Sequence, residues 1–241
     1  MDPAYGERYA DLYHRHWWWR TRENAILHEL RRFRPASGWR RLLDVGSGDG
    51  LLFPRLAEFG EVEGVEPEPA LIAADSPWRD KLHTVPFDEH FRPGHRYDVI
   101  LFLDVLEHLD EPAMALRHAA SLLEPNGIVL ATVPAFMSLW TTHDDLNYHR
   151  RRYDRRSMRA LISESGFRLE RERFLFQWLV GAKLAVKTLE SIRHPKPAPP
   201  RVPPEPVNTA LRWISASEEW LGRTVQPPFG GSLLVVARPA T

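Results

Sequence analysis

The sequence contains no cysteine among its 241 residues. This absence excludes a disulfide-stabilised scaffold, a thiolate zinc site, an iron–sulfur cluster and a cysteine nucleophile. The chain also lacks net charge, because 32 Lys and Arg residues balance 32 Asp and Glu residues. Phosphate contacts need an excess of basic side chains, so we do not expect a general nucleic-acid-binding protein.

Long hydrophobic runs are missing as well. The most apolar stretch, residues 174–186, includes Gln177 and Lys183. It is shorter than the roughly 20 residues that a membrane-spanning helix needs. The N-terminus has no basic start followed by an apolar run, so no secretory signal is expected. We expect a cytoplasmic protein in which this stretch forms a buried helix, with contact to a membrane surface as the alternative.

Short apolar segments alternate with amphipathic ones along most of the chain. This alternation predicts an α/β fold: a Rossmann-like sheet of seven mostly parallel strands, with helices on both faces. Strands are expected within 40–46, 61–67, 81–87, 97–104, 128–134, 167–176 and 231–238. Helices are expected at 3–15, 21–34, 49–59, 68–74, 113–123, 155–165, 177–193 and 208–221.

A glycine-rich turn follows the first expected strand, with the sequence Asp-Val-Gly-Ser-Gly-Asp-Gly at 44–50. Glycines there adopt positive φ and let a ligand approach the backbone closely. A dinucleotide-binding turn would place its third glycine at position 51, which is Leu51. Asp44 adds negative charge that suits an amine or sulfonium better than a pyrophosphate. Glu66, at the end of the second strand, is placed to hold the two hydroxyls of a ribose.

These residues resemble the class I S-adenosylmethionine-dependent methyltransferases. The resemblance implies that Gly46 and Gly48 contact the cofactor through their backbone, that Asp44 orients its amino group and that Glu66 binds its ribose. Pro67, Phe87 and Asp88 would lie around the adenine. The full set of expected cofactor-binding residues is Asp44, Gly46, Ser47, Gly48, Glu66, Pro67, Phe87, Asp88, Leu103 and Asp104. The alternatives are a module that binds S-adenosylmethionine without turnover and a dehydrogenase built on a similar sheet.

Two further segments, LFLDVLEHLDEP (101–112) and HDDLNYHRRRY (143–153), resemble a narrower branch. This branch contains the ubiquinone-pathway O-methyltransferases and related bacterial small-molecule and glycan-pathway methyltransferases. The resemblance implies a small-molecule or lipid- or glycan-linked acceptor that is methylated at oxygen, with nitrogen or carbon as alternatives. His108, His143 and His149 are the candidate bases, and Tyr153 is a candidate positioning hydroxyl. His108 leads because it follows the fourth strand directly.

Charged clusters near these segments allow two interpretations each. Some relatives bind a divalent cation with an acid-x-x-Glu-His set, which corresponds here to Asp104, Glu107 and His108. We expect instead a hydrogen-bonded polar cluster without a metal ion. The six arginines within 149–159 form either structural ion pairs or a grip on an anionic acceptor.

The sequence predicts four parts. These are an N-terminal helical cap (1–40), a cofactor-binding core (41–176), a helical insert (177–230) and the final core strand (231–241). The insert contains seven prolines within 195–206, which predicts a stiff, extended linker. We expect the insert to pack over the substrate cleft with the N-terminal helices and Trp17–Trp19. It would serve as a supporting aromatic layer, an apolar acceptor pocket or a membrane-facing lid.

Overall fold

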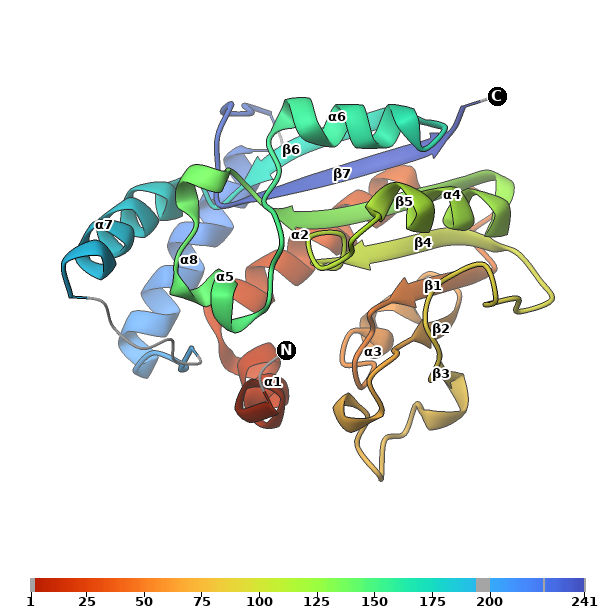
Figure 1. Cartoon of the computed structure of the whole chain (residues 1–241), viewed down its shortest axis with the longest axis horizontal. Coiled ribbons are helices and arrows are strands. Elements are labelled where there is room, and N and C mark those ends of the chain that lie inside the picture. The colour runs from red at the N-terminus through yellow and green to blue at the C-terminus, as the bar shows by residue number, and fades with distance from the viewer. Residues whose placement is uncertain (1–2, 194–199, 223, 241) are drawn as a thin grey trace.

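The computed structural model describes residues 3–193, 200–222 and 224–240 and contains one seven-stranded sheet (Figure 1). The strands lie in the order β3-β2-β1-β4-β5-β7-β6, and only β7 runs antiparallel to its neighbours. Their bounds are β1 Arg41–Val45, β2 Glu61–Val65, β3 Leu82–His83, β4 Tyr97–Leu103, β5 Leu123–Pro134, β6 Phe167–Leu175 and β7 Ser232–Pro239. The expected Rossmann-like, mostly parallel sheet is therefore confirmed.

Helices cover both faces of this sheet because successive strand residues point to opposite sides. Leu42 of β1 and Leu101 of β4 belong to the core under α2, α3 and α8, whereas Leu43 and Ile100 belong to the core under α4 and α6. The α-helices are α1 Pro3–Arg15, α2 Trp17–Phe33, α3 Phe53–Leu56, α4 Pro112–Leu122, α5 Thr142–Leu146, α6 Arg155–Glu164, α7 Trp178–Arg193 and α8 Glu205–Leu221. Three 3₁₀ turns, η1 Pro69–Leu71, η2 Arg79–Lys81 and η3 Met137–Leu139, complete the elements.

Several expected elements between the first and fourth strands are shorter than the sequence suggested. The helix expected at 49–59 is reduced to α3, since Gly50 has φ +70° and cannot continue a helix. The helix expected at 68–74 is the single turn η1, because Ile72 is already extended. The strand expected at 81–87 is the two-residue β3, and Pro86 has no N–H to continue the ladder. This edge of the sheet is built mainly of loops.

Helix α2 begins at Trp17, four residues before the expected start. The N–H of Trp17 donates to Oδ1 of Asn208 in α8 (3.0 Å), and Nδ2 of Asn208 donates to the carbonyl of Arg15 (2.8 Å). Deeper in the molecule, the buried Arg173 of β6 lies 3.0 Å from Glu29 of α2 and 3.0 Å from Glu219 of α8. These contacts fasten the C-terminal insert to the N-terminal helices and the sheet.

The apolar stretch 174–186 is not the buried helix that its composition suggested. Phe174–Phe176 are buried, but α7 exposes nearly every residue from 181 to 192. None of the described helices is long and apolar enough to span a membrane. Residues 195–199 of the expected proline linker lie outside the described residues, and Pro206 belongs to the first turn of α8.

Candidate active site

The glycine turn after β1 has the backbone that its sequence predicted. Gly46, Gly48 and Gly50 have φ of +70°, +54° and +70°. A side chain at Gly46 would lie 2.7 Å from Val105, so the turn packs directly under the loop that follows β4. A side chain at Gly48 would meet no atom within 4 Å. The open side of the turn at Gly48 is therefore the place where a ligand can reach the backbone.

Two buried carboxyl groups flank this turn. Glu66 accepts hydrogen bonds from the N–H of Gly48 (3.0 Å) and the N–H of Glu68 (2.9 Å), and burial raises its pKa. Asp44 is only 4% exposed, and its Oδ1 has no hydrogen-bond partner. Burial raises the pKa of Asp44 to about 7 although the nearby Arg22 opposes the shift. An unpartnered buried carboxyl oxygen is expensive, which suits a site completed by a cationic ligand.

The other expected cofactor residues surround the turn less closely. Ser47 is directed at β2, where a side chain on Gly64 would lie 2.4 Å from its Oγ. Pro67 is exposed, and Phe87 packs against Phe91, Phe102 and His118. Asp88 is exposed and accepts the N–H of His90 (2.9 Å). Leu103, the last residue of β4, is half-buried beside the core under α2.

Asp104 follows β4 in a left-handed conformation, with φ +59°. Its carboxylate lies 2.8 Å from the guanidinium of Arg22 and accepts the hydroxyl of Thr132 (3.2 Å). Phe136 and Phe176, which follow β5 and β6, also have positive φ. Strained residues of this kind concentrate at functional sites. Here they follow the carboxyl ends of β4, β5 and β6, and α/β folds bind ligands at the carboxyl ends of their strands.

Arg22 is a site residue that sequence reasoning missed. It lies on α2, is buried, and contacts the ring of Trp18 (5.3 Å from its centroid) as well as Asp104. A signal was present in the sequence, because Arg22 precedes the apolar residue Ile26 by four positions and so shares its helix face. A charged residue on the apolar face of a helix needs a buried partner, and here that partner is Asp104.

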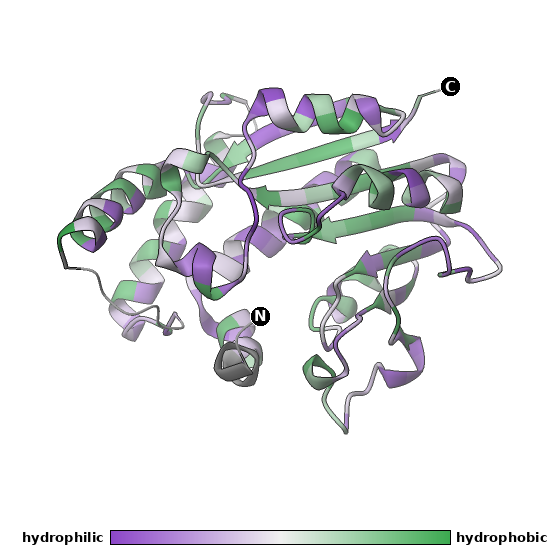
Figure 2. Ribbon diagram, in the orientation of Figure 1, coloured by the Kyte–Doolittle hydropathy of each residue, from purple (hydrophilic) through white to green (hydrophobic). Residues whose placement is uncertain are grey.

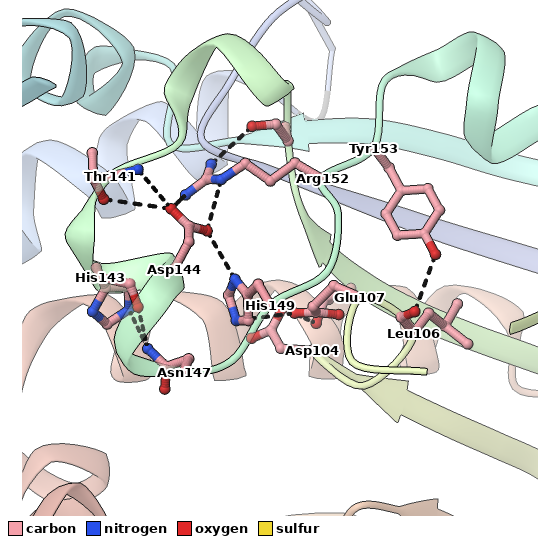
Figure 3. Close-up of polar contacts among 12 residues, drawn as sticks. Asp104, Leu106, Glu107, Thr141, His143, Asp144, Asn147, His149, Arg152 and Tyr153 are labelled. Carbon is pink, nitrogen blue, oxygen red and sulfur yellow. Dashed lines mark hydrogen bonds and ion pairs between the residues drawn. The ribbon is translucent and has the colours of Figure 1, made fainter. Parts of the chain in front are cut away.

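A second polar cluster joins the loop after β4 to the segment that follows α5 (Figure 3). Asp144 is completely buried, and its carboxylate forms a hydrogen bond with Nδ1 of His149 (2.8 Å). Arg152 donates two hydrogen bonds of 2.8 Å to the same carboxylate. Burial opposes ionisation of Asp144, but the hydrogen bonds from His149 and Arg152 hold its pKa below the usual range. The Nε2 of His149 then faces Glu107, 3.9 Å away.

Glu107 is fully buried, and neither of its carboxyl oxygens has a hydrogen-bond partner. Burial, reinforced by the nearby Asp104, raises its pKa well above the usual value. The N–H of Arg150 donates to the carbonyl of Glu107 (3.0 Å), and its Nε donates to the carbonyl of His108 (2.9 Å). These backbone contacts hold His149 over the loop that carries Glu107.

The remaining candidates differ in what their side chains can do. His108 packs edge-on against His149, with 4.8 Å between centroids, and burial lowers its pKa to about 4. His143 lies 3.2 Å from the Asn147 amide, and burial lowers its pKa to about 4 as well. The hydroxyl of Tyr153 donates to the carbonyl of Leu106 (3.1 Å) and is buried. The Tyr153 hydroxyl, which was expected to position a substrate, therefore holds the loop after β4 in place.

The arginines of 149–159 are mostly paired within the protein. Arg152 binds Asp144, and Arg155 and Arg159 both pair with Glu172. Arg150 pairs with Asp110, and Arg151 donates to the carbonyl of Asp110 (3.1 Å). Five of the six thus contact protein groups, as the ion-pair interpretation requires.

Among the described residues, one group of side chains has the composition of a metal site. Ligand atoms of Glu107, His108 and His149 all lie within 4.8 Å of one another. Asp104, the first acid of the expected set, is not in this group and pairs with Arg22 instead. In the structure, His149 therefore takes the place of Asp104 in the candidate metal-binding set.

Comparison with known proteins gives matches to both the sequence and the fold. A model of the methyltransferase domain matches residues 18–172, more than half of the chain. The ubiquinone biosynthesis O-methyltransferase of Azorhizobium caulinodans is 36% identical over 112 residues, which cover 44% of each chain. The protein of the same name from Ralstonia nicotianae is 32% identical over 144 residues, covering 53% of this chain and 60% of that one.

Among solved structures, a SAM-dependent methyltransferase from Archaeoglobus fulgidus has a TM-score of 0.55 at 19% identity, covering 89% of this chain and 93% of that chain. At this identity, the likeness shows the fold alone. The chain spans about half the length of the curated relatives that it matches.

Proposed function

Because the chain belongs to the methyltransferase domain family, and with it to the class I S-adenosylmethionine-dependent methyltransferases, we propose that it transfers a methyl group from S-adenosylmethionine to an acceptor oxygen. The observation that carries the proposal is the pair of buried carboxyls at the glycine turn. Asp44 has an unpartnered oxygen for an ammonium group, and Glu66 is fixed beside Gly48 for a ribose. Neither feature is needed by a turn that only connects a strand to a helix.

The residues present fit this cofactor. Gly48 leaves open space where the ligand would approach, and the carboxyl groups suit a ligand with a positive amine and sulfonium. The bound cofactor would supply an electrophilic methyl group. The protein then has to bind and orient both molecules, exclude water and accept the proton of the acceptor hydroxyl. In balance, a carbon–oxygen bond forms, the carbon–sulfur bond breaks, and the hydroxyl proton passes to a base.

His149 is the base that the geometry supports best, in place of His108. Asp144 accepts from its Nδ1, which leaves Nε2 as the free acceptor atom on the side of Glu107. A buried carboxylate that holds one imidazole nitrogen in this way fixes both the tautomer and the ring orientation of a general base. His108 lacks such a carboxylate contact among the described residues and instead packs against the ring of His149.

Oxygen is the proposed acceptor atom because the curated relatives are named O-methyltransferases. The acceptor is a small or lipid-linked molecule. An anionic acceptor is not favoured by the arginines of 149–159, since five of the six contact protein groups. A neutral phenol or alcohol requires only a base near its proton and an apolar surface for the rest of the molecule.

The test is methyl transfer by the purified full-length chain from labelled S-adenosylmethionine to matched hydroxyl, amine and carbon acceptors. Production of S-adenosylhomocysteine with a hydroxyl acceptor is expected. Calorimetric titration with S-adenosylhomocysteine and with NAD distinguishes the dehydrogenase alternative, because binding of NAD alone would contradict the proposal. Cofactor binding without turnover on any acceptor would support the non-catalytic alternative.

The base is tested with His149→Ala, which should lower kcat about 100-fold or more while the cofactor dissociation constant stays within a factor of about three. Asp144→Asn should lower kcat with little change in cofactor binding. The exposed His14 supplies the matched control, and His14→Ala should be unchanged. A wild-type kcat in His149→Ala together with a collapse in His108→Ala would return the role to His108.

A further inference from the structure

Helix α8 exposes most of its large apolar side chains and buries polar ones. The residues that it buries against the body are Asn208, Ser215 and Glu219, all of them polar. Its large apolar side chains are exposed, except for Leu211, which is half-buried at the core. The exposed ones are Val207, Trp213, Ile214, Trp220 and Leu221. A surface helix ordinarily shows the opposite arrangement, with its apolar stripe facing the core.

The two tryptophans are the strongest part of this pattern. Trp213 is 71% exposed and Trp220 is 65% exposed. They are seven residues apart, which is close to two helical turns, so both lie on one side of α8. Ile214 and Leu221, also seven residues apart, follow them directly and extend the same side. The result is a continuous apolar stripe along the helix.

Helix α7, at the same end of the molecule as α8 (Figure 1), exposes apolar side chains as well. Leu184, Val186, Leu189 and Ile192 are exposed on it, and Val225 and Phe229 are exposed after α8. Of the fifteen large hydrophobic residues that are exposed in the described part of the chain, eleven lie between 184 and 229. Figure 2 shows this hydrophobic colouring on α7 and α8, at the end of the molecule away from β3 and α4. Concentration of this kind marks an interaction surface, whereas scattered exposed side chains do not.

The surface is also basic. Among the described residues of 178–225, three basic side chains are exposed, Lys187, Arg201 and Arg212, against one exposed acidic side chain, Glu205. The other three glutamates of this segment bind protein groups. Glu190 accepts hydrogen bonds from Thr142, and Glu218 accepts hydrogen bonds from the N–H groups of Gln177 and Trp178. Glu219 forms an ion pair with Arg173. The exposed basic residues Lys187, Arg201 and Arg212 lie on or between the two helices.

We propose that this apolar and basic surface of α7 and α8 docks the protein on an anionic lipid bilayer. Aliphatic side chains would enter the boundary between headgroups and acyl chains, tryptophans would lie at headgroup depth, and Lys and Arg would face anionic headgroups. A second copy of the chain fits less well, because it would bring the same basic side chains of two molecules together.

Docking in this way would also orient the active site. The carboxyl ends of β1, β4 and β5 point toward the end of the molecule that holds α7 and α8 (Figure 1). Lys187 of α7 donates to the carbonyl of Ser138 (2.7 Å), and Glu190 accepts from Thr142 (2.7 Å), the residue before His143. The docking helix is thus joined to the loop that carries His143 and Asp144. The proposal holds whether or not the site transfers methyl groups, since it rests on a different surface.

The experiment is flotation of the full-length chain with lipid vesicles. Vesicles of equal parts phosphatidylcholine and phosphatidylglycerol should carry the protein, vesicles of phosphatidylcholine alone should carry much less, and added salt should weaken the binding. The double variant Trp213→Ser/Trp220→Ser should lower the ratio of bound to free protein about tenfold or more, whereas Trp213→Phe/Trp220→Phe should retain most binding. Arg201→Gln/Arg212→Gln should lower binding to the anionic vesicles alone.

Met114 of α4 provides the matched control, because it is 52% exposed and lies away from the docking surface. Met114→Ser should float as the wild type does. Every variant should keep its melting temperature, since the altered side chains are exposed. Absence of flotation, or wild-type flotation of Trp213→Ser/Trp220→Ser, would overturn the proposal. If the wild type does not bind vesicles but is a dimer in light scattering, and the Trp213→Ser/Trp220→Ser variant is a monomer, the surface would be assigned to a second copy instead.

Discussion

The carboxyl group of Asp44 should make cofactor binding depend on pH near neutrality. Its Oδ1 is buried without a hydrogen-bond partner, and burial raises its pKa to about 7, against the effect of Arg22. An ammonium group of the cofactor needs the ionised carboxylate. Below pH 7 the ligand-free protein holds a proton on Asp44 that has to leave when the ligand binds. Affinity should therefore rise as the pH rises toward 7 and level off above it.

The size of this effect follows from the titration. Each pH unit below the pKa should weaken binding about tenfold, or ~1.4 kcal/mol, so that binding at about pH 5.5 is about 30-fold weaker than at about pH 8. Asp44→Asn should remove this slope. It should also weaken binding at about pH 8 by about 10- to 100-fold, because a charged hydrogen bond of about 1.5–3 kcal/mol is lost.

The same substitution should act in the opposite direction on stability. A carboxyl group with a raised pKa in the folded state contributes stability at low pH and loses it as the pH rises through the folded pKa. The shift from 3.8 to about 7 corresponds to a cost on the order of 4 kcal/mol above pH 7. Asp44→Asn should therefore unfold at a higher temperature than the wild type at about pH 8, in the absence of ligand.

Calorimetric titration with S-adenosylhomocysteine across this pH range measures the affinity, and buffers with different ionisation heats count the released protons. Asp11→Asn, at an exposed residue paired with Arg15, serves as the control and should keep the wild-type slope. The reasoning is refuted by a wild-type affinity that does not change between about pH 5.5 and 8. It is refuted equally by Asp44→Asn that retains the slope.

Three further results are expected. Tyr153→Phe should lower the free energy of unfolding, measured with denaturant, by about 1–2 kcal/mol, because the hydroxyl donates to a backbone carbonyl. It should lower kcat less than threefold; a larger loss of kcat at unchanged stability would assign the hydroxyl a direct role. Arg173→Met should lower the free energy of unfolding by about 3–5 kcal/mol, because it removes the cation that pairs with the buried Glu29 and Glu219. Replacement of all three residues by apolar ones should restore most of this stability. Chelation of divalent cations should change turnover less than twofold, because Asp104, the first acid of the expected set, pairs with Arg22 instead of joining Glu107, His108 and His149. Restoration of a chelated, inactive enzyme by Mn²⁺ would contradict this.

Local chemistry was sufficient to predict the centre of this protein from its sequence. The order of short apolar strands and amphipathic helices specified a mostly parallel sheet, because such a sheet needs cover on both faces. The glycine turn and the acids at 44 and 66 predicted a ligand-binding edge, since positive φ and strand-end carboxyls are properties of short sequence motifs. Where glycine and proline interrupt the pattern, as at Gly50 and Pro86, the sequence overestimated the regular elements.

Contacts between distant segments decided the rest. Arg22 reaches Asp104 across 82 positions of the chain, and His149 obtains its carboxylate from the buried capping residue of a five-residue helix, α5. Neither partner can be read from spacing, because helical and strand periodicity describe neighbours within one element. The apolar stretch 174–186 shows the same limit: its composition suited a buried helix, yet α2 and α8 contribute to the core on one face of the sheet while residues 181–192 of α7 are mostly exposed. The sequence by itself thus determined the fold and predicted the edge at which a ligand would bind, whereas the tertiary structure decided which histidine has a carboxylate partner and which hydrophobic residues remain exposed.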